Sequence, residues 1–295
     1  VPTRYDSSGP RSNMCSNRRV EHTRAMTPRP VPAAPTPRSA VVTGAARGIG
    51  RGIAELLVTQ GYAVVVTDVD GEAVQATARE IGAVAGLAHD VRDPQAHRTV
   101  AEVAAGHGRL AAWFNNAGVG DDGRLSELSE EQVRRLVEVN LLGVLWGMRA
   151  ALEAFGDGSG DIVNTASLAG LGPVPGYSVY AATKAATVSA TMSVAAETPR
   201  RVRVHAICPD GVRTAMLDEQ DPEGLGAALV HSGGRILSVE EIAEAAVGLV
   251  GSGRVVRTVP LWRGALMRTI SLAPGVAAKG TALFAAQGRR ALRRG

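Results

Sequence analysis

Two side chains able to take part in proton transfer stand four residues apart in the sequence, Tyr180 and Lys184. On a helix this spacing places both on one face, with Cβ atoms about 5–6 Å apart. A nearby ammonium lowers the pKa of a phenol from about 10 and makes it usable as a general base. Tyr177 lacks this partner, because the residue four positions later is Ala181. The pair therefore predicts acid–base chemistry centred on Tyr180.

The identity of the cation supports this interpretation. Of the 32 basic residues only Lys184 and Lys279 are lysines, so a chain that otherwise uses arginine has lysine at this position. A compact ammonium can also donate to a sugar hydroxyl, which the planar guanidinium does not replace. Ser167 lies thirteen residues before Tyr180, where it could bind the same reacting oxygen. The alternative is a chance pair on an ordinary surface helix.

A glycine-rich turn links an apolar run to a helical pattern near the start of the periodic part of the chain. Residues 39–43 are typical of a buried strand, the turn contains Gly44, Gly48 and Gly50, and residues 53–58 continue as a helix. Such a turn directs backbone N–H groups and the positive end of the helix toward a phosphate. The spacing Gly-x-x-x-Gly-x-Gly is neither the usual dinucleotide fingerprint nor a Walker loop. By itself it also fits a plain tight turn.

A carboxylate stands at the end of the next predicted strand. Residues 63–67 lead directly to Asp68, eighteen residues after Gly50. A carboxylate at this place accepts from both ribose hydroxyls and repels a 2′-phosphate, so NAD is favoured over NADP. Arg47 in the glycine loop could instead attract that phosphate. We give Asp68 more weight because Val69, and not an arginine, follows it.

Strands and helices continue to alternate along the chain. Helices are predicted over about 72–80, 94–105 and 127–154, and strands near 83–89, 110–114 and 161–166, the last of which ends at Ser167. This alternation implies a parallel sheet with right-handed crossovers and with ligands at the carboxyl ends of the strands. The predicted fold class is α/β, a doubly wound Rossmann-like parallel sheet with helices on both faces in a single domain.

One polar residue interrupts the apolar face of the long helix predicted over 127–154. Asn140 stands among valines and leucines at helical spacing. A buried amide needs hydrogen-bond partners. It could kink the helix through a local hydrogen bond, or it could hold a water molecule near a catalytic site.

Charge is distributed unevenly along the chain. Residues 1–38 carry a net charge of +5 and residues 251–295 a net charge of +9, whereas the middle carries −10. No aromatic residues are interleaved with the terminal arginines, so we expect no specific nucleic-acid binding. Two cysteines and six histidines without ligand spacing predict neither a disulfide framework nor a metal site.

The two ends differ in composition from the middle. Residues 1–38 are rich in proline and arginine and are predicted to be a disordered extension. They lack the apolar core of a secretion signal, and the prolines between 28 and 37 break the amphipathic helix of an organellar presequence, so we expect a cytoplasmic location. Residues 39–260 would form the catalytic domain. Residues 261–295 would form a basic C-terminal extension, in which the helix-like stretch from Pro274 to Arg294 could cover the active site, mediate assembly, contact an anionic membrane or remain solvated.

From about Ser39 to Val259 the chain resembles the short-chain dehydrogenase/reductase family. The resemblance rests on Thr43 to Gly50, on Asn116-Ala117-Gly118 and on Pro209 to Thr214, together with the residues that fall where the family has its catalytic tetrad.

The resemblance implies a seven-stranded sheet. The catalytic residues it implies are Asn140, Ser167, Tyr180 and Lys184. The cofactor-binding residues expected are Gly44, Arg47, Gly48, Ile49, Gly50, Asp68, Asp90, Val91, Asn116, Ala117, Gly118, Tyr180, Lys184, Pro209, Val212 and Thr214. Asp210 departs from the family, which usually has glycine there.

The resemblance implies an NAD-dependent oxidoreductase that interconverts a secondary alcohol and a ketone. Tyr180 would exchange the hydroxyl proton, Lys184 would lower the pKa of Tyr180 and bind the nicotinamide ribose, and Ser167 would bind the reacting oxygen. Asn140 would hold a water that links Lys184 to solvent, and Thr214 would bond the carboxamide. The alternative is a regulatory module that binds NAD without turnover.

Substrate choice and assembly are expected to depend on two other segments. The apolar residues between 215 and 237 suggest a lid over a lipophilic or alicyclic substrate: Met216, Leu217, Leu225, Leu229, Val230, Ile236 and Leu237. The family resemblance also implies a homodimer or homotetramer, assembled through the long helix that ends before Gly156 and through residues 181–197. In the latter, Ala182, Ala186, Ser189 and Ser193 form a stripe that would allow close helix approach.

Overall fold

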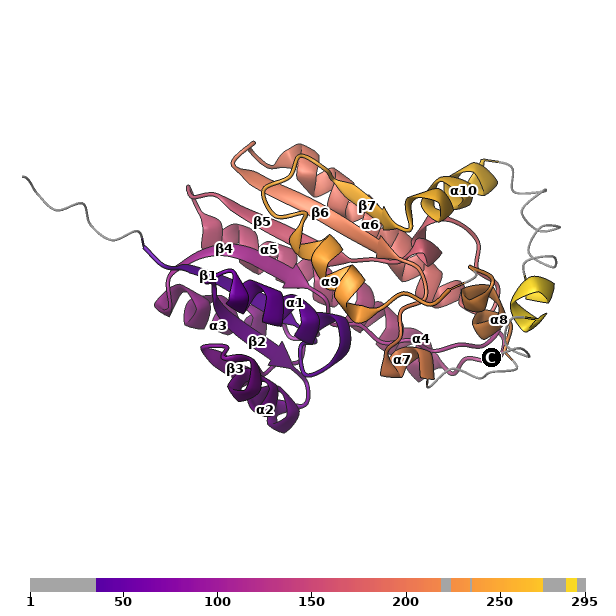
Figure 1. Cartoon of the computed structure of the whole chain (residues 1–295), viewed down its shortest axis with the longest axis horizontal. Coiled ribbons are helices and arrows are strands. Elements are labelled where there is room, and N and C mark those ends of the chain that lie inside the picture. Colours follow the sequence, from indigo (N-terminus) through magenta and orange to yellow (C-terminus); the bar gives the residue numbers. More distant parts are fainter. Residues whose placement is uncertain (1–35, 219–223, 234, 273–284, 291–295) are drawn as a thin grey trace, which may run out of the picture. The chain divides into compact units, whose positions relative to one another are not determined.

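Seven parallel strands form one sheet in the order β3-β2-β1-β4-β5-β6-β7 (Figure 1). The strands are β1 (Arg38–Thr43), β2 (Ala63–Asp68), β3 (Ala85–Ala88), β4 (Arg109–Asn115), β5 (Gly160–Thr165), β6 (Val202–Pro209) and β7 (Val256–Val259). The order reverses between β1 and β4, which creates the crevice where ligands of such sheets bind. The predicted doubly wound, seven-stranded sheet is confirmed.

This computed structural model describes residues 36–218, 224–233, 235–272 and 285–290. They belong to one compact unit that begins at Thr36. Most of the N-terminal segment predicted to be disordered therefore lies outside the described residues. Within the described part of the chain, no helix is long and apolar enough to cross a membrane.

Helices cover both faces of the sheet and connect the strands. They are α1 (Gly48–Thr59), α2 (Gly71–Ile81), α3 (Pro94–Gly106), α4 (Glu130–Val137), α5 (Gly143–Phe155), α6 (Ser178–Glu197), α7 (Ala215–Asp218), α8 (Leu225–His231), α9 (Val239–Val247) and α10 (Leu261–Ser271). Helices α1, α2 and α9 pack on one face, and α3 and α5 pack on the other. The short helices α7 and α8, with α10, lie beyond the carboxyl ends of the strands (Figure 1).

Alternate residues of the strands supply the two cores. In β1, Val42 faces the core under α1, whereas Val41 faces the core under α3 and α5. A strand buried on both faces has a continuous apolar sequence. The valine-rich segments could therefore be recognised as parallel strands. With few aromatic residues available, Trp113 and Phe114 of β4 are the largest fully buried side chains described.

The helix predicted as one piece over 127–154 is divided into three. Helix α4 begins at the capping box of Ser129 and Gln132 and ends at Val137. A π-helical segment, η1 (Glu138–Leu142), follows, and α5 then continues to Phe155. The prediction of an uninterrupted α-helix was therefore wrong. A π-bulge of this kind adds a residue to the turn and re-aims the side chains within it, here Asn140.

Two buried histidines lie between α3 and the sheet. The rings of His89 and His97 meet edge to face, with centroids 4.4 Å apart, and both residues are at least 97% buried. Thr67 Oγ1 bonds His89 Nδ1 at 2.9 Å, and the Val91 carbonyl oxygen bonds His97 Nε2 at 2.9 Å. Burial lowers the pKa of His89 to about 3 and also lowers that of His97.

These histidines predict a loss of stability in mild acid. The folded state keeps His89 neutral, while the unfolded chain binds a proton below its ordinary pKa near 6.5. Stability is therefore lost as the pH falls from about 6.5 toward about 3, and by pH 5 His89 alone should cost about 2 kcal/mol. Urea unfolding at pH 7 and pH 5 measures this. His89→Gln should show a smaller difference between the two pH values than the parent or the exposed control His107→Gln; an equal difference would contradict the assignment.

Candidate active site

One cavity of about 1220 Å³ opens at the carboxyl ends of the strands. Every residue proposed from the sequence for catalysis or cofactor binding lines this cavity, except Gly50 and Asn140. The lining comes from the loops after six strands and from α6 and α10. Residues up to 226 positions apart, from Gly44 to Ile270, thus meet at one site. In the described chain, no group of three or more His, Cys, Asp or Glu is arranged to hold a metal ion.

The glycine turn between β1 and α1 is shaped by backbone contacts. Gly44 and Gly48 have φ values of 63° and 59°, a region that favours glycine. A Cβ at Gly44 would lie 2.6 Å from the Ala117 Cα, and one at Gly50 would overlap the Gly44 carbonyl oxygen. Gly50 is therefore needed to let α1 approach the turn, which explains why it contributes to the loop without reaching the cavity.

Helix α1 begins at the cavity without a side-chain cap. Arg47 occupies the N-cap position in extended backbone geometry, and no side-chain capping hydrogen bond is formed. In contrast, Asp70, Asp93, Ser129 and Ser238 cap α2, α3, α4 and α9. The first N–H groups of α1 and the positive end of its dipole are thus available to an anion at the cavity wall.

The loop after β4 is tied to the glycine turn through Thr43. The Thr43 hydroxyl accepts from the backbone N–H groups of Asn116 and Ala117 at 3.0 and 3.1 Å. The Asn116 amide donates to the carbonyl oxygens of Thr43 and Gly44, and its Oδ1 accepts from Thr165 Oγ1 at 3.2 Å. These bonds fix the Asn116-Ala117-Gly118 segment as one wall of the cavity.

Two carboxylates near strand ends, Asp68 and Asp90, also line the cavity. Asp68 Oδ2 accepts from the Ala46 backbone N–H at 3.1 Å, and Oδ1 accepts from that of Asp70 at 3.2 Å. Asp68 is thereby held against the glycine turn at the end of β2. Asp90 pairs with Arg92, which is the main cause of its lowered pKa. The structure thus places Asp68 and Asp90 at the cavity, near the carboxyl ends of β2 and β3, as the sequence predicted.

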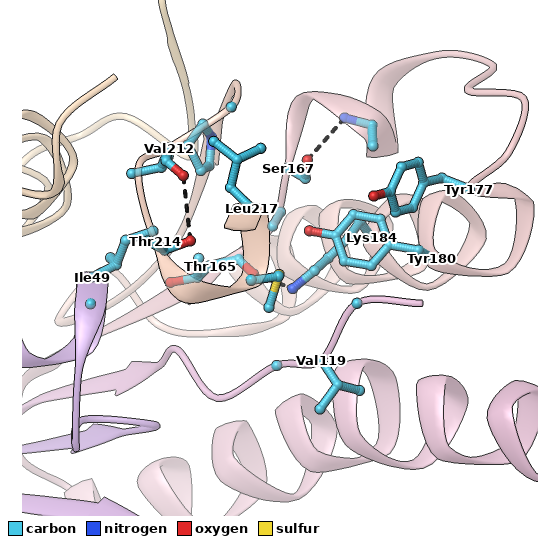
Figure 2. A pocket seen from close by; sticks show the side chains of 18 of the residues that line it. Ile49, Val119, Thr165, Ser167, Tyr177, Tyr180, Lys184, Val212, Thr214 and Leu217 are labelled. Atoms are coloured by element: carbon cyan, nitrogen blue, oxygen red, sulfur yellow. Dashed lines mark hydrogen bonds between the residues drawn. The ribbon is translucent and has the colours of Figure 1, made fainter. Parts of the chain in front are cut away.

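Helix α6 brings Tyr180 and Lys184 to the cavity from one face, as the spacing predicts (Figure 2). Lys184 Nζ donates to the Thr165 carbonyl oxygen at 2.8 Å and lies 5.6 Å from the centroid of the Tyr180 ring. Ser167, at the end of β5, forms a hydrogen bond with Tyr180. Its Oγ also accepts from the Ala169 N–H at 3.1 Å, which fixes its orientation.

The prediction that Lys184 lowers the pKa of Tyr180 was wrong for this structure. Tyr180 keeps some exposure to the cavity, but the surrounding protein atoms dominate: burial raises its pKa, and the hydrogen bond with Ser167 lowers it only in part. Lys184 is directed to the Thr165 carbonyl instead. Burial also lowers the pKa of Lys184 to about 8, so its ammonium form predominates at pH 7. At neutral pH the site therefore presents a protonated phenol, the form that donates a proton.

Asn140 acts on the cavity through the backbone of Val119. Its Nδ2 donates to the Val119 carbonyl oxygen and its Oδ1 accepts from the Val119 N–H, both at 2.8 Å. The Asn140 carbonyl oxygen accepts from Thr187 Oγ1 on α6 at 3.3 Å. The amide is fully buried and both its polar atoms are used by the protein. The structure thus gives its side chain the role of holding the wall after Gly118, and the helix break at η1 aims it there.

The remaining cavity wall has an apolar part, although charged residues such as Asp121, Arg135 and Arg213 also line it. The apolar part contains Leu168, Pro173, Val174, Met216, Leu217, Leu229, Val230, Leu266, Met267 and Ile270. The expected lid thus contributes through Met216, Leu217, Leu229 and Val230. Ile236 does not line the cavity and Leu237 is buried in the core, while the side chain of Leu225 lies outside the described residues. Arg235, the cation of this segment, pairs with Glu241.

Helix α10, in the C-terminal extension, was not assigned to the site by the sequence. Arg263, Leu266, Met267 and Ile270 of α10 line the cavity, and Ser271 Oγ donates to the Leu171 carbonyl oxygen at 2.6 Å. The signal was present, because these four residues recur at intervals of three and four on one helical stripe. Helix α10 thus covers part of the cavity, whereas most of the stretch from Pro274 to Arg294, for which a covering role was one of the predicted alternatives, lies outside the described residues. The rest of the extension is described only at residues 285–290.

A buried ion pair joins α10 to the loop after β6. Arg263 Nε lies 2.7 Å from Asp210 Oδ2, with only 11% and 9% of the two side chains exposed. The N–H is not aligned with the oxygen, so charge rather than a directed hydrogen bond holds the contact. Burial raises the pKa of Asp210, and the charge of Arg263 lowers it in part. Asp210, the departure from the family pattern, therefore has a partner in the C-terminal helix.

The residues present fit a nicotinamide dinucleotide. The uncapped start of α1 and the glycine turn provide an anion site of the kind that binds pyrophosphate. Asp68, Asp90, Tyr180, Lys184 and Thr214 line the same cavity as this turn. Thr214 is held by a hydrogen bond to the Val212 carbonyl oxygen at 3.4 Å (Figure 2).

Comparison with known proteins gives the same assignment. The short chain dehydrogenase family model matches residues 38–224. A cyclohexanol dehydrogenase from Acinetobacter sp. (strain SE19) is 35% identical over 213 residues, covering 70% of this chain and 84% of that protein. A sorbitol dehydrogenase from Cereibacter sphaeroides is 36% identical over 231 residues, covering 72% and 90%. The crystal structure of a short-chain dehydrogenase/reductase from Burkholderia phymatum in complex with NAD has a TM-score of 0.71 at 29% identity, covering 79% of this chain and 92% of that one. The chain therefore belongs to the short-chain dehydrogenase family and is an NAD(P)-dependent oxidoreductase that acts on secondary alcohols and ketones.

Proposed function

We propose that this enzyme uses NAD to interconvert an apolar, alicyclic secondary alcohol and its ketone. The observation that carries the proposal is the convergence of Ser167, Tyr180 and Lys184 on a cavity with an anion-binding turn at one end and an apolar wall at the other. The cyclohexanol dehydrogenase among its relatives supports an alicyclic substrate. A regulatory NAD-binding module would not need the hydroxyl pair or the buried lysine.

The catalytic side chains have two kinds of role: one transfers a proton, and the others position the substrate, the cofactor or the cavity wall. The bound nicotinamide supplies a hydride acceptor or donor. Tyr180 Oη exchanges the proton of the substrate hydroxyl, and Ser167 Oγ positions the same substrate oxygen by hydrogen bonding. Lys184 holds a cofactor ribose hydroxyl and places a positive charge near the phenol. Asn140 keeps the Val119 segment in place beside them.

The preference for NAD over NADP rests on Asp68. Its carboxylate lines the cavity at the end of β2, where it would accept from ribose hydroxyls and repel a 2′-phosphate. Arg47 also lines the cavity, and it would favour the phosphate. The fixed attachment of Asp68 to the Ala46 and Asp70 backbone supports the first effect as the larger one.

A substrate and cofactor screen tests this function. Initial rates with cyclohexanol and with linear secondary alcohols, followed by absorbance of the reduced cofactor, should show turnover with NAD and a higher kcat/KM for the cyclic alcohol. NAD should exceed NADP in kcat/KM, and Asp68→Ser should lower that ratio at least tenfold. Binding of NAD without turnover of any alcohol or ketone would instead identify the regulatory module.

We further propose that the enzyme is a homodimer or homotetramer assembled through α5 and α6. Ala182, Ser189 and Ser193 of α6 are exposed, and they form a stripe of small side chains that permits close helix packing. Met192 beside them is 50% exposed. Light scattering of the purified protein should give twice or four times the chain mass of 30.5 kDa, and a monomer mass would contradict this assembly.

A further inference from the structure

A second phenol, Tyr177, stands beside the catalytic one. It precedes α6 directly, and its ring meets that of Tyr180 edge to face, with centroids 5.7 Å apart and an interplanar angle of 65°. The residue is 93% buried and lines the cavity. Its backbone is fixed at both sides, because its N–H donates to the Val174 carbonyl oxygen and its own carbonyl accepts from Ala181.

The surroundings of Tyr177 hold the ring in one orientation. A Cβ at Gly226 on α8 would overlap the ring, so α8 packs directly on it. The hydroxyl ends of Tyr177 and Tyr180 point the same way, toward the side on which Ser167 lies (Figure 2). Substrate that reaches the hydroxyls of Ser167 and Tyr180 would therefore also lie near that of Tyr177.

The hydroxyl of Tyr177 has no hydrogen-bond partner among the described residues, and the oxygen reaches the cavity. Buried phenol hydroxyls are normally hydrogen-bonded. The chain thus leaves one directed phenol hydroxyl at the cavity surface without a protein partner among the described residues, and a ligand oxygen can pair with it.

The chemical state of Tyr177 suits recognition and not proton transfer. Burial is the main cause of its raised pKa, and the negative charge of Asp122 adds to the effect. No cation follows at the fourth position, where Ala181 stands. The phenol keeps its proton over the working range of pH and remains a fixed hydrogen-bond donor and acceptor.

We infer that the Tyr177 hydroxyl binds a second oxygen of the substrate, next to the oxygen that reacts at Ser167 and Tyr180. The preferred substrates would then be vicinal diols or α-hydroxyketones on an apolar, cyclic frame. This inference rests on the proposed function and adds a specificity-determining residue to it. The second oxygen would satisfy a group that a simple alcohol leaves unpaired, and sites that bind a hydroxyl in this way discriminate against analogues lacking it.

The test compares cyclohexanol with cis- and trans-1,2-cyclohexanediol in the NAD-dependent reaction. The parent should favour at least one diol over cyclohexanol by about tenfold in kcat/KM, the size expected of one hydrogen bond. Tyr177→Phe should lower that diol-to-alcohol ratio about tenfold, mainly through the KM of the diol. Tyr62→Phe removes a phenol hydroxyl outside the cavity, where it accepts from Arg38, and should keep the parent ratio.

Binding measurements separate this inference from the proposed reaction. Calorimetric titration of the NADH-loaded enzyme with diol and with cyclohexanol should show tighter diol binding in the parent and not in Tyr177→Phe. An enzyme that oxidises cyclohexanol but has the same diol-to-alcohol ratio in the parent and in Tyr177→Phe would overturn the inference and leave the proposed function in place. Absence of any turnover, with diol selectivity in binding retained, would overturn the function alone.

Discussion

Replacement of Tyr180 by phenylalanine is expected to lower kcat/KM for alcohol oxidation by about 10²–10⁴-fold, the usual contribution of a positioned acid–base group. The ring remains, whereas the exchange of the substrate proton and the hydrogen bond with Ser167 are lost. NAD binding should persist, because the glycine turn and the start of α1 are untouched. Initial rates give the first quantity, and fluorescence titration of the reduced cofactor gives the second.

The pH profile and a matched variant make this result specific. The raised pKa of Tyr180 predicts that oxidation becomes faster as the pH rises above neutrality, because the phenol must first lose its proton. That dependence should disappear from the residual rate of Tyr180→Phe. Tyr62→Phe should retain parent activity. A Tyr180→Phe enzyme with parent turnover would remove Tyr180 from the mechanism.

The second large effect is expected at the ion pair between α10 and the loop after β6. Arg263→Leu leaves the carboxylate of Asp210 buried without a partner, and breaking a buried pair in this way typically costs about 3–5 kcal/mol. Because Leu266, Met267 and Ile270 share the same helix, the KM of an apolar substrate should rise more than that of NAD. Urea unfolding and steady-state kinetics measure the two effects.

The stability that Arg263→Leu loses relative to the parent is expected to increase as the pH rises. Without the charge of Arg263, the pKa of Asp210 rises further above its ordinary value. A carboxyl whose folded pKa is raised contributes stability at low pH and loses it as the pH increases, so the variant should be closer to the parent at pH 5 than at pH 8. Asp210→Asn in the same background should recover most of the stability.

The exposed Arg268 on the same helix provides the control. Arg268→Leu should change the free energy of unfolding by no more than about 0.5 kcal/mol. If Arg263→Leu behaved like this control in both stability and substrate KM, the pair would have no part in holding α10 over the site.

Local patterns were sufficient to predict the sheet and the cofactor end of the site. Valine-rich runs separated by helical patterns indicated parallel strands, and parallel strands bring the segments after them to one edge. Asp68, Asn116 and Ser167 each lie at the end of a strand or within two residues after it, so a parallel sheet is enough to bring them to one edge. The four-residue spacing of Tyr180 and Lys184 was similarly a local property of one helix.

Other features depended on contacts between distant segments. The sequence did not indicate that Asp210 and Arg263 form an ion pair, since they are 53 positions apart and three helices and a strand lie between them. The sequence showed that Asn140 is a polar residue on an apolar helix face. Its hydrogen-bond partner, the Val119 backbone, could be identified only in the folded structure, where η1 lies against the loop after β4. The sign of the Tyr180 pKa shift was wrong for the same reason, because burial by surrounding segments outweighs one cation at helical spacing.

By itself, then, the sequence predicted the alternation of strands and helices, a glycine turn suited to an anion and a Tyr180–Lys184 pair on one helix face, because each follows from periodicity or spacing within a short segment. Only the tertiary structure decided which walls enclose the substrate, that α10 supplies one of them, and that Tyr177 faces the same space as Tyr180. Burial and charge pairing are sums over neighbours from the whole chain, and those neighbours exist only once the chain is folded.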